Sequence, residues 1–326
     1  MAANDIQYFY KLFVIFLYSF FVTSWSIPYI AKRLGRYKYF VNDKYKKGKQ
    51  LVPTMGGISI LMGILVSLAL SQILLNTEDL GNLFIFYFIV VVYALYGVVD
   101  DLFSFKKRYD KIFVLMILTF PIASLISDTS LNLYYWRIEI GPLFSLVVIP
   151  VYIMVVANMV NLHAGYNGLT QGLSLILLAA LGIKSYFDSG LQYFIYLMPL
   201  LGAVMAFLPS TSYPARLLPG NVGDLLVGAG IGAFIVVTRN LWFGIFILIP
   251  HIINFLMDTW TIAIRKIPDN KFGRLRSDGT IEAPASMKYK SLKFLVVSWF
   301  RLKERQAVWV LYGFTALFCA AGLALF

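Results

Sequence analysis

Residues 143–172 read LFSLVVIPVYIMVVANMVNLHAGYNGLTQG, an apolar run that ends in a cluster of amides and glycines. The run as far as Ala157 has the composition of a membrane-spanning helix. Asn and Gly are poor helix formers, so the segment after Ala157 predicts the end of that helix. The amides either cap the helix in a polar loop or belong to a site. Which of these holds depends on what else lies at the same face of the membrane.

The composition of the whole chain is that of a polytopic membrane protein. Of 326 residues, 60% are hydrophobic and only 13% are charged, and the mean hydropathy is +0.76. Soluble domains carry about 25% charged residues. The single cysteine, Cys319, excludes a disulfide framework or a thiolate metal site within the chain. The first apolar stretch lacks a basic leader and a small-residue cleavage site, so we expect a retained span.

A helical span needs roughly 20 mostly apolar residues, and ten segments of the chain qualify. We therefore predict an all-α polytopic membrane protein with about ten transmembrane helices, and we expect residues 1–326 to form one domain. The predicted spans are 8–30, 55–75, 82–99, 111–127, 142–160, 168–183, 190–208, 221–237, 241–263 and 306–326.

The distribution of positive charge predicts the orientation in the membrane. One set of alternate loops holds 24 of the 28 Lys and Arg residues, and the other face holds only Lys11, Arg137, Lys184 and Arg239. Because short cytoplasmic loops are enriched in Lys and Arg, we expect the basic loops in the cytoplasm and both termini outside. The basic residues are tied to short loops at the membrane edge, which argues against nucleic acid as a partner.

Acidic residues occur at two further places on the predicted cytoplasmic face. Asp100 and Asp101 directly follow the third apolar run, and Asp224 lies near the start of 221–237. Carboxylates at a membrane edge are costly unless they are solvated, paired or metal-bound, and adjacent acids repel each other, which favours a cation. The plainer alternatives are a solvated loop for the pair and an acid at a helix N-terminus for Asp224.

Two basic segments join these clusters at the same face. Residues 44–60, KYKKGKQLVPTMGGISI, place lysines ahead of Gly56 and Gly57, and such a loop can cradle a phosphate. Residues 264–284 contain Arg274 and Arg276, and guanidinium forks bind phosphate well, although a solvated turn explains them equally. Carboxylates, amides and phosphate-binding cations together indicate Mg²⁺-dependent chemistry on a phosphorylated substrate, with Mn²⁺ as an alternative metal.

The motifs resemble those of the polyprenyl-phosphate N-acetylhexosamine-1-phosphate transferases, over roughly residues 30–280. This family includes the bacterial phospho-MurNAc-pentapeptide translocase and the eukaryotic UDP-GlcNAc–dolichyl-phosphate GlcNAc-1-phosphate transferase. The matching stretches are VPTMGG (52–57), DDLFSFKKRYDK (100–111), NMVNLHAGYNGL (158–169), YPAR (213–216) and VGD (222–224).

The resemblance implies a fold and a reaction. The family has ten transmembrane helices with cytoplasmic catalytic loops, and it transfers a sugar 1-phosphate from a UDP-N-acetylhexosamine to a polyprenyl or dolichyl phosphate, with UMP as the leaving group. Ala164 and Asn167 replace aspartates of the bacterial motif, and the last loop has RLR at 274–276 in place of a histidine-rich motif. These motifs therefore resemble the form found in eukaryotic and archaeal members of the family, and UDP-GlcNAc is the expected donor. The location would be the cell membrane of an archaeon or the endoplasmic reticulum of a eukaryote, and the sequence is compatible with a homodimer.

By the same resemblance, individual residues receive roles. Asn161 and Asp224 would bind the metal. Asp100, Asp101 and Lys111 would form the catalytic group, with Asp100 acting on the acceptor phosphate. The expected substrate-binding residues are Lys49, Asn158, Asn167, Gly168, Arg216, Arg274 and Arg276. Asn167 would contact uridine or ribose, and we expect His163 to form a local hydrogen bond.

A different class of protein also fits some of these features. An ion-coupled secondary transporter uses intramembrane acids and glycine-rich helices, and Asp100, Asp224 and Asp258 would then bind the ion. The acids cluster at one face and not at the midplane, and no inverted repeat is visible, so we favour the transferase.

Overall fold

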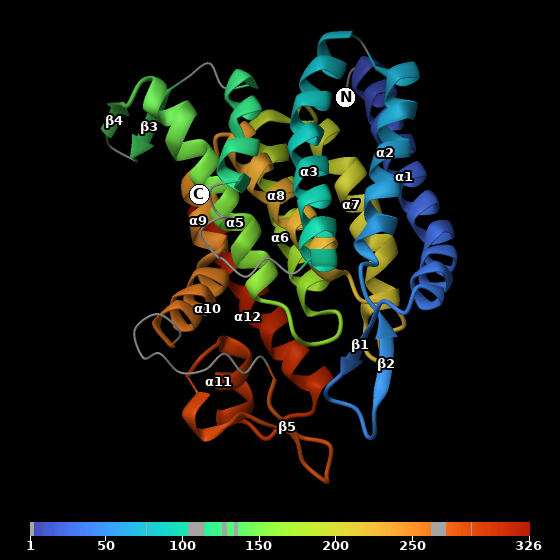
Figure 1. The fold of residues 1–326 in the computed structure, drawn as a ribbon. Helices are drawn as coiled ribbons and strands as arrows, with labels where there is room; N and C mark the ends of the chain where they lie inside the picture. The colour runs from blue at the N-terminus through green and yellow to red at the C-terminus, as the bar shows by residue number, and fades with distance from the viewer. Residues whose placement is uncertain are drawn as a thin grey trace.

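The computed structural model describes residues 3–75, 77–103, 114–125, 129–133, 136–261, 272–287 and 289–326, and helices dominate it (Figure 1). Eight helical segments in these ranges are long and apolar enough to cross a membrane. They are α1 (Ala3–Arg36), α2 (Gly57–Leu74), α3 (Thr77–Phe103), α5 (Ile149–Leu162) with the preceding π-helix η2 (Phe144–Val148), α6 (Leu169–Ser189), α7 (Phe194–Thr211), α8 (Gly220–Val237) and α12 (Glu304–Leu325). The predicted class, an all-α polytopic membrane protein, is confirmed.

A ninth span is bent. The sequence predicts one span over 241–263, but α9 (Leu241–Ile247) and α10 (Ile249–Thr259) meet at 64°. Pro250 stands in the first turn of α10. Proline fits that position and disrupts a continuing helix, which explains the break.

The predicted span at 111–127 lies partly outside the described residues, whereas the ends of its neighbours are described. At the end of α3, Asp101 accepts hydrogen bonds from the first backbone amides of α8. At the start of η2, the Phe144 ring lies 5.5 Å from the guanidinium of Arg239, which follows the other end of α8. The end of α3 and the start of η2 therefore lie near opposite ends of α8, and the 3₁₀-helix η1 (Phe120–Leu125) lies between them in the sequence.

The short elements are three antiparallel hairpins, a 3₁₀ turn and a short helix. They are β1–β2 (Phe40–Asp43, Gln50–Pro53), β3–β4 (Ser130–Leu133, Trp136–Glu139), β5–β6 (Arg274–Leu275, Ile281–Glu282), η4 (Ala285–Met287) and α11 (Leu292–Trp299). We call the side that carries β1–β2, residues 163–168 and 212–219, β5–β6 and α11 the loop face.

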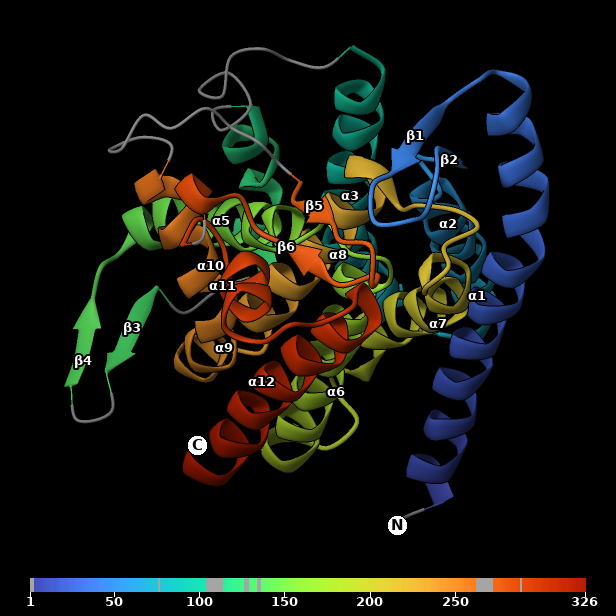
Figure 2. The same cartoon turned by 90° about the horizontal axis from the view of Figure 1, so that it is seen from below.

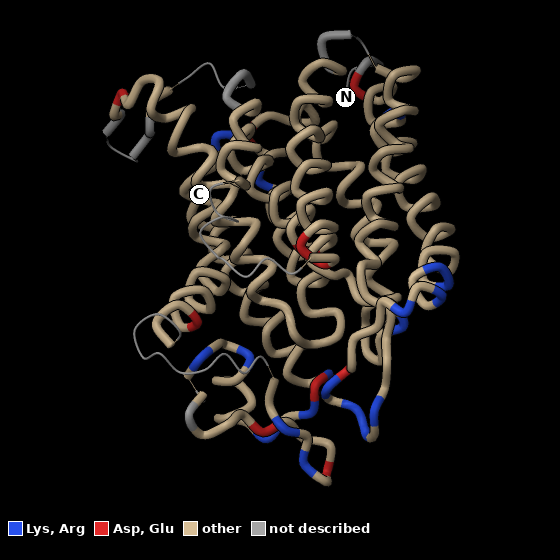
Figure 3. Tube along the Cα trace, in the orientation of Figure 1, with Lys and Arg blue, Asp and Glu red and all other residues tan. Residues whose placement is uncertain are grey.

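Most described Lys and Arg residues gather at the loop face, whereas the N-terminus lies at the opposite end (Figures 1 and 3). The C-terminal Phe326 ring packs on Phe243 and Phe246 of α9, which also lie away from the loop face. The two termini thus share one side, as the charge pattern predicts.

Helix α8 forms the centre of the bundle, with α3, α5, α6 and α7 around it (Figure 2). Its glycines let neighbouring helices approach closely. A Cβ on Gly228 would lie 2.7 Å from the Ala157 Cα, and one on Gly232 would lie 3.1 Å from the Ile153 Cα. The helices α5 and α8 are therefore antiparallel. A residue four positions later in α8 lies against a residue four positions earlier in α5.

Gly57 is the glycine at which a side chain is expected to do most damage to the fold. A Cβ there would overlap the Cα and N of Gly223, and backbone atoms at a helix start cannot move aside. We expect Gly57→Ala to lower the free energy of unfolding by roughly 1–3 kcal/mol, measured by thermal unfolding in detergent. Gly313→Ala is the matched control, because a Cβ on Gly313 meets nothing within 4 Å. Equal melting temperatures for the two variants would contradict this packing.

Candidate active site

The two adjacent acids at the end of α3 are tied to the start of α8. Asp101 Oδ1 accepts a hydrogen bond from the Asn221 backbone amide at 3.0 Å, and its Oδ2 accepts one from the Val222 amide at 3.2 Å. Asp100 Oδ2 accepts from Asn221 Nδ2 at 3.1 Å. Asp101 thus caps α8 from another helix, where a negative charge also meets the positive end of the helix dipole. The cap brings the Asp100–Asp101 pair to the VGD motif.

Asp224 lies one turn inside α8 and is buried with 4% of its surface exposed. Its Oδ1 accepts a hydrogen bond from Gln171 Nε2 at 3.0 Å, across from the first turn of α6. The register of α5 and α8 places Asn161 opposite Asp224, one step beyond the contact between Ala157 and Gly228. The structure therefore brings the two predicted metal ligands to the same level of the bundle.

The site also has the donor chemistry for a hard cation. The side-chain oxygen Oε1 of Gln171 is buried beside Asp224 and has no hydrogen-bond partner, and a buried oxygen acceptor needs a donor or a cation. Mg²⁺ binds proteins through one or two carboxylates, with waters and substrate phosphates completing its shell. In the described part of the chain no three His, Cys, Asp or Glu side chains form a metal cluster. The residues fit an ion held jointly with a phosphate better than a closed structural site.

The VPTMGG stretch has a structural role that the sequence did not predict. The amides of Gly56 and Gly57 donate to the carbonyls of Leu218 and Pro219, and the Leu218 amide donates to the Pro53 carbonyl. The Gly56 and Gly57 amides are therefore not available to a phosphate, because they dock the loop onto residues 218–219. This docking holds the start of α2 against the start of α8.

Asn167 is held by a buried cluster that sequence reasoning missed. Its backbone amide donates to Glu304 Oε1 at 2.8 Å, and its Nδ2 donates to Asp43 Oδ2 at 2.9 Å. Lys46 Nζ lies 3.1 Å from Asp43 Oδ2 and 2.6 Å from Glu304 Oε2. We call Asp43, Lys46, Asn167 and Glu304 the Lys46 cluster, and all four residues are buried. The next residue, Gly168, begins α6 with a φ of 79°, a left-handed conformation that favours glycine.

The other predicted substrate-binding residues are less tightly placed. Lys49 and Arg216 are exposed on the loop face. Asn158 Nδ2 donates to the Met154 carbonyl of its own helix at 2.8 Å. Lys111 lies outside the described residues.

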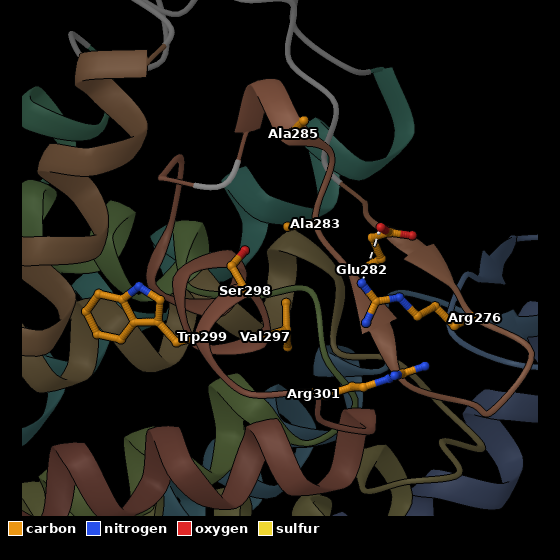
Figure 4. A pocket seen from close by; sticks show the side chains of 8 residues that line it. All are labelled: Arg276, Glu282, Ala283, Ala285, Val297, Ser298, Trp299 and Arg301. Carbon is orange, nitrogen blue, oxygen red and sulfur yellow. Dashed lines mark hydrogen bonds and ion pairs between the residues drawn. The ribbon is translucent and has the colours of Figure 1, made fainter.

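Arg274 and Arg276 belong to the β5–β6 hairpin. Arg274 is exposed, and Arg276 forms an ion pair with Glu282 at 3.2 Å. Arg276 lines a pocket of about 300 Å³ with Trp299 and Arg301, and the Arg276 guanidinium lies beside Glu282 (Figure 4). No residue that lines this pocket comes from α3, α6 or α8. No described contact joins these arginines to Asp100 or Asp224.

The only two histidines of the chain, His163 and His251, pack edge to face with ring centroids 4.6 Å apart. Neither ring nitrogen of His163 has a hydrogen-bond partner, so the expected local hydrogen bond is wrong. Burial, with smaller effects from His251 and the Lys293 ammonium, lowers the pKa of His163 well below its usual range. His163 is therefore a neutral ring packed under the amide-rich loop.

The cap formed by Asp101 makes a prediction about local stability. In Asp101→Ala the amides of Asn221 and Val222 lose their acceptor, and loss of a helix cap costs about 0.5–2 kcal/mol. We expect amide hydrogen exchange at 221–224 to become roughly 2- to 30-fold faster. Asp188→Ala, on the opposite side of the membrane, is the control. Unchanged exchange at 221–224 would show that Asp101 does not cap α8.

Comparison with known proteins agrees with this arrangement. Residues 83–239, which include the Asp100–Asp101 pair, Asn161 and Asp224, match glycosyl transferase family 4. A protein of Saccharolobus solfataricus described as a UDP-N-acetylglucosamine–dolichyl-phosphate N-acetylglucosaminephosphotransferase is 27% identical over 95% of both chains. A Methanocaldococcus jannaschii glycosyltransferase is 25% identical over 97% of both chains. The phospho-N-acetylmuramoyl-pentapeptide-transferase of Streptococcus agalactiae is 28% identical over 70% of this chain and 74% of its own.

The fold, the motifs and these matches together make the chain similar to membrane-embedded glycosyl-1-phosphate transferases. The chain is a relative of the polyprenyl-phosphate N-acetylhexosamine-1-phosphate transferases, as its motifs indicate.

Proposed function

We propose that the protein transfers N-acetylglucosamine 1-phosphate from UDP-GlcNAc to a polyprenyl phosphate such as dolichyl phosphate, and that UMP leaves. The observation that carries this proposal is the meeting of Asp100, Asp101 and Asp224 at the start of α8. Three carboxylates from two helices at one membrane edge require positive charge. A divalent cation with a bound diphosphate, and the cationic side chains of the loop face, satisfy that requirement.

The proposed reaction is a displacement at phosphorus. An oxygen of the lipid phosphate attacks the β-phosphorus of the nucleotide sugar, the bond from that phosphorus to the α,β-bridging oxygen breaks, and UMP leaves with the electron pair. Such transfers depend mainly on positioning and charge neutralisation. A lipid phosphate is already largely ionised near pH 7, so Asp100 is assigned the orientation of the acceptor phosphate more than proton abstraction.

The metal site is assigned to Asp224 and Asn161, with Gln171 beside them. Mg²⁺ bound there would neutralise charge on the diphosphate oxygens. Asp101 holds the start of α8 in place and so fixes Asp224. Asn167 and Gly168 are assigned to the nucleoside, and Asn158 supports them from the end of α5. Lys49, Lys111, Arg216, Arg274 and Arg276 are assigned to the phosphates or the sugar.

The choice of donor and lipid rests on the archaeal relatives, whose descriptions name UDP-N-acetylglucosamine and dolichyl phosphate. Their similarity extends over nearly the whole chain, and the amide-rich motif at 158–169 has the eukaryotic and archaeal style. We accordingly place the protein in a cell membrane with its loop face in the cytoplasm, at the first membrane step of N-glycan-type synthesis.

The transporter remains the competing function, and the leaving nucleotide separates the two. Purified protein in detergent is incubated with a polyprenyl phosphate, Mg²⁺ and UDP-GlcNAc, and the soluble nucleotides are separated. The proposal predicts UMP in an amount equal to the lipid-linked sugar, and no UMP without the lipid phosphate. Absence of UMP with UDP-GlcNAc and with other UDP-N-acetylhexosamines would overturn the transferase and favour the transporter.

A further inference from the structure

The Lys46 cluster joins three segments that are far apart in the sequence. Asp43 and Lys46 come from the β1–β2 hairpin, Asn167 from the loop before α6, and Glu304 from the first turn of α12. Lys46 Nζ also lies 4.0 Å from the centre of the Tyr213 ring, in the YPAR stretch. Every segment that it touches is a loop or helix start at the loop face.

The charges of the cluster are arranged around one lysine. Lys46 donates a hydrogen bond to Glu304 and forms an ion pair with Asp43, and only 7% of Asp43 and 3% of Glu304 is exposed. Two buried carboxylates so near each other are stable as anions only with a cation between them. Lys46 supplies that cation, and it opposes the rise in the pKa of Glu304 that burial causes. An ionised carboxylate only accepts hydrogen bonds.

This charge state fixes the orientation of the Asn167 side chain. Because Asp43 can only accept, the amide NH₂ of Asn167 must face it, as the 2.9 Å contact shows. The side-chain oxygen of Asn167 then points the other way, and among the described residues none donates to it. The cluster thus presents Asn167 as a hydrogen-bond acceptor. The position is close to the candidate centre, because Gln171, four residues later on α6, donates to Asp224.

We propose that Asp43, Lys46 and Glu304 are positioning residues that set the base specificity of the nucleotide site by fixing the Asn167 amide. This inference rests on the proposed function, in which Asn167 contacts the nucleoside. Uracil carries a hydrogen on N3, which donates to an acceptor. Cytosine has an unprotonated N3 and meets the same acceptor with a lone pair. A fixed acceptor therefore selects uridine over cytidine nucleotides.

The test compares the binding of UMP and CMP to the full-length protein in detergent with Mg²⁺. In Asp43→Asn an amide replaces the carboxylate, so the Asn167 side chain is free to turn over. We expect the preference for UMP over CMP to fall by at least about tenfold, mainly through weaker UMP binding. Lys46→Met is expected to cause the same fall, whereas Lys46→Arg retains the charge and keeps the preference. Lys47→Met, an exposed neighbour, is the matched control with wild-type preference.

The outcomes separate this inference from the proposed function. A wild-type preference for UMP in folded Asp43→Asn overturns the inference and leaves the transferase intact. If Asp43→Asn does not fold, the preference for UMP over CMP is measured on Lys46→Met instead. A wild-type preference in that variant also overturns the inference. Wild-type protein that fails to bind UMP would overturn both the inference and the proposed function.

Discussion

Replacement of Asp224 by asparagine is expected to lower the rate of sugar-phosphate transfer by about 10³-fold or more. The amide has nearly the same shape as the carboxylate, but it removes the negative charge that faces the proposed metal. Asparagine can still pair with Gln171, which now donates to Asp224 at 3.0 Å. The fold should therefore persist, and the loss should appear in turnover and in metal affinity.

A matched control for this variant exists on the same face of the protein. Asp278 is an exposed carboxylate of the β5–β6 turn that pairs with Arg301 at 2.9 Å. Its hydrogen bonds to Thr280, with help from Arg301, lower its pKa to about 2. Asp278→Asn removes one charge from the loop face and should leave transfer within about twofold of wild type. Equal activity of the Asp224 and Asp278 variants would remove Asp224 from the centre of the site.

Removal of divalent metal is expected to have the second large effect. With excess EDTA, we expect transfer to fall at least 100-fold, because the diphosphate then lacks its counter-charge beside Asp224. Mg²⁺ added beyond the chelator should restore the rate, and Mn²⁺ should restore it at least in part.

The control for chelation is a measurement without catalysis. Thermal unfolding of the wild-type protein should shift upward when Mg²⁺ and UMP are added together, and this shift should be lost in Asp224→Asn. Full transfer activity in EDTA would contradict a metal-dependent reaction and leave neutralisation of the diphosphate to Lys49 and the arginines.

The sequence predicted the spans well because hydropathy needs no knowledge of neighbours. It also predicted that polar clusters at Asp100, Asn161 and Asp224 lie at one face, since helix direction alternates between spans. The bend between α9 and α10 was missed because the apolar composition continues through Pro250, although that proline was the available signal.

The contacts within the site depend on partners that are remote in sequence. Asn167 and Glu304 are 137 residues apart, and Asp43 and Asn167 are 124 residues apart. No periodicity links such pairs. A weak indication in the sequence places Gln171 in the site. It is an amide in the first turn of a membrane helix, four residues after Asn167. Residues 44–60 were interpreted as a loop that can cradle a phosphate, and the tight contact of Gly57 with Gly223 appears only when α2 and α8 are packed.

The measurement that tests the central claim most directly follows the β-phosphorus of the donor. UDP-GlcNAc labelled with ³²P at the β-phosphate is incubated with the purified protein, a polyprenyl phosphate and Mg²⁺, and the lipid is extracted. Transfer of a sugar 1-phosphate predicts that the label enters the lipid together with the sugar and that unlabelled UMP is released. Label that remains in the nucleotide as UDP while the sugar enters the lipid would contradict the proposed reaction, as would the absence of any labelled lipid.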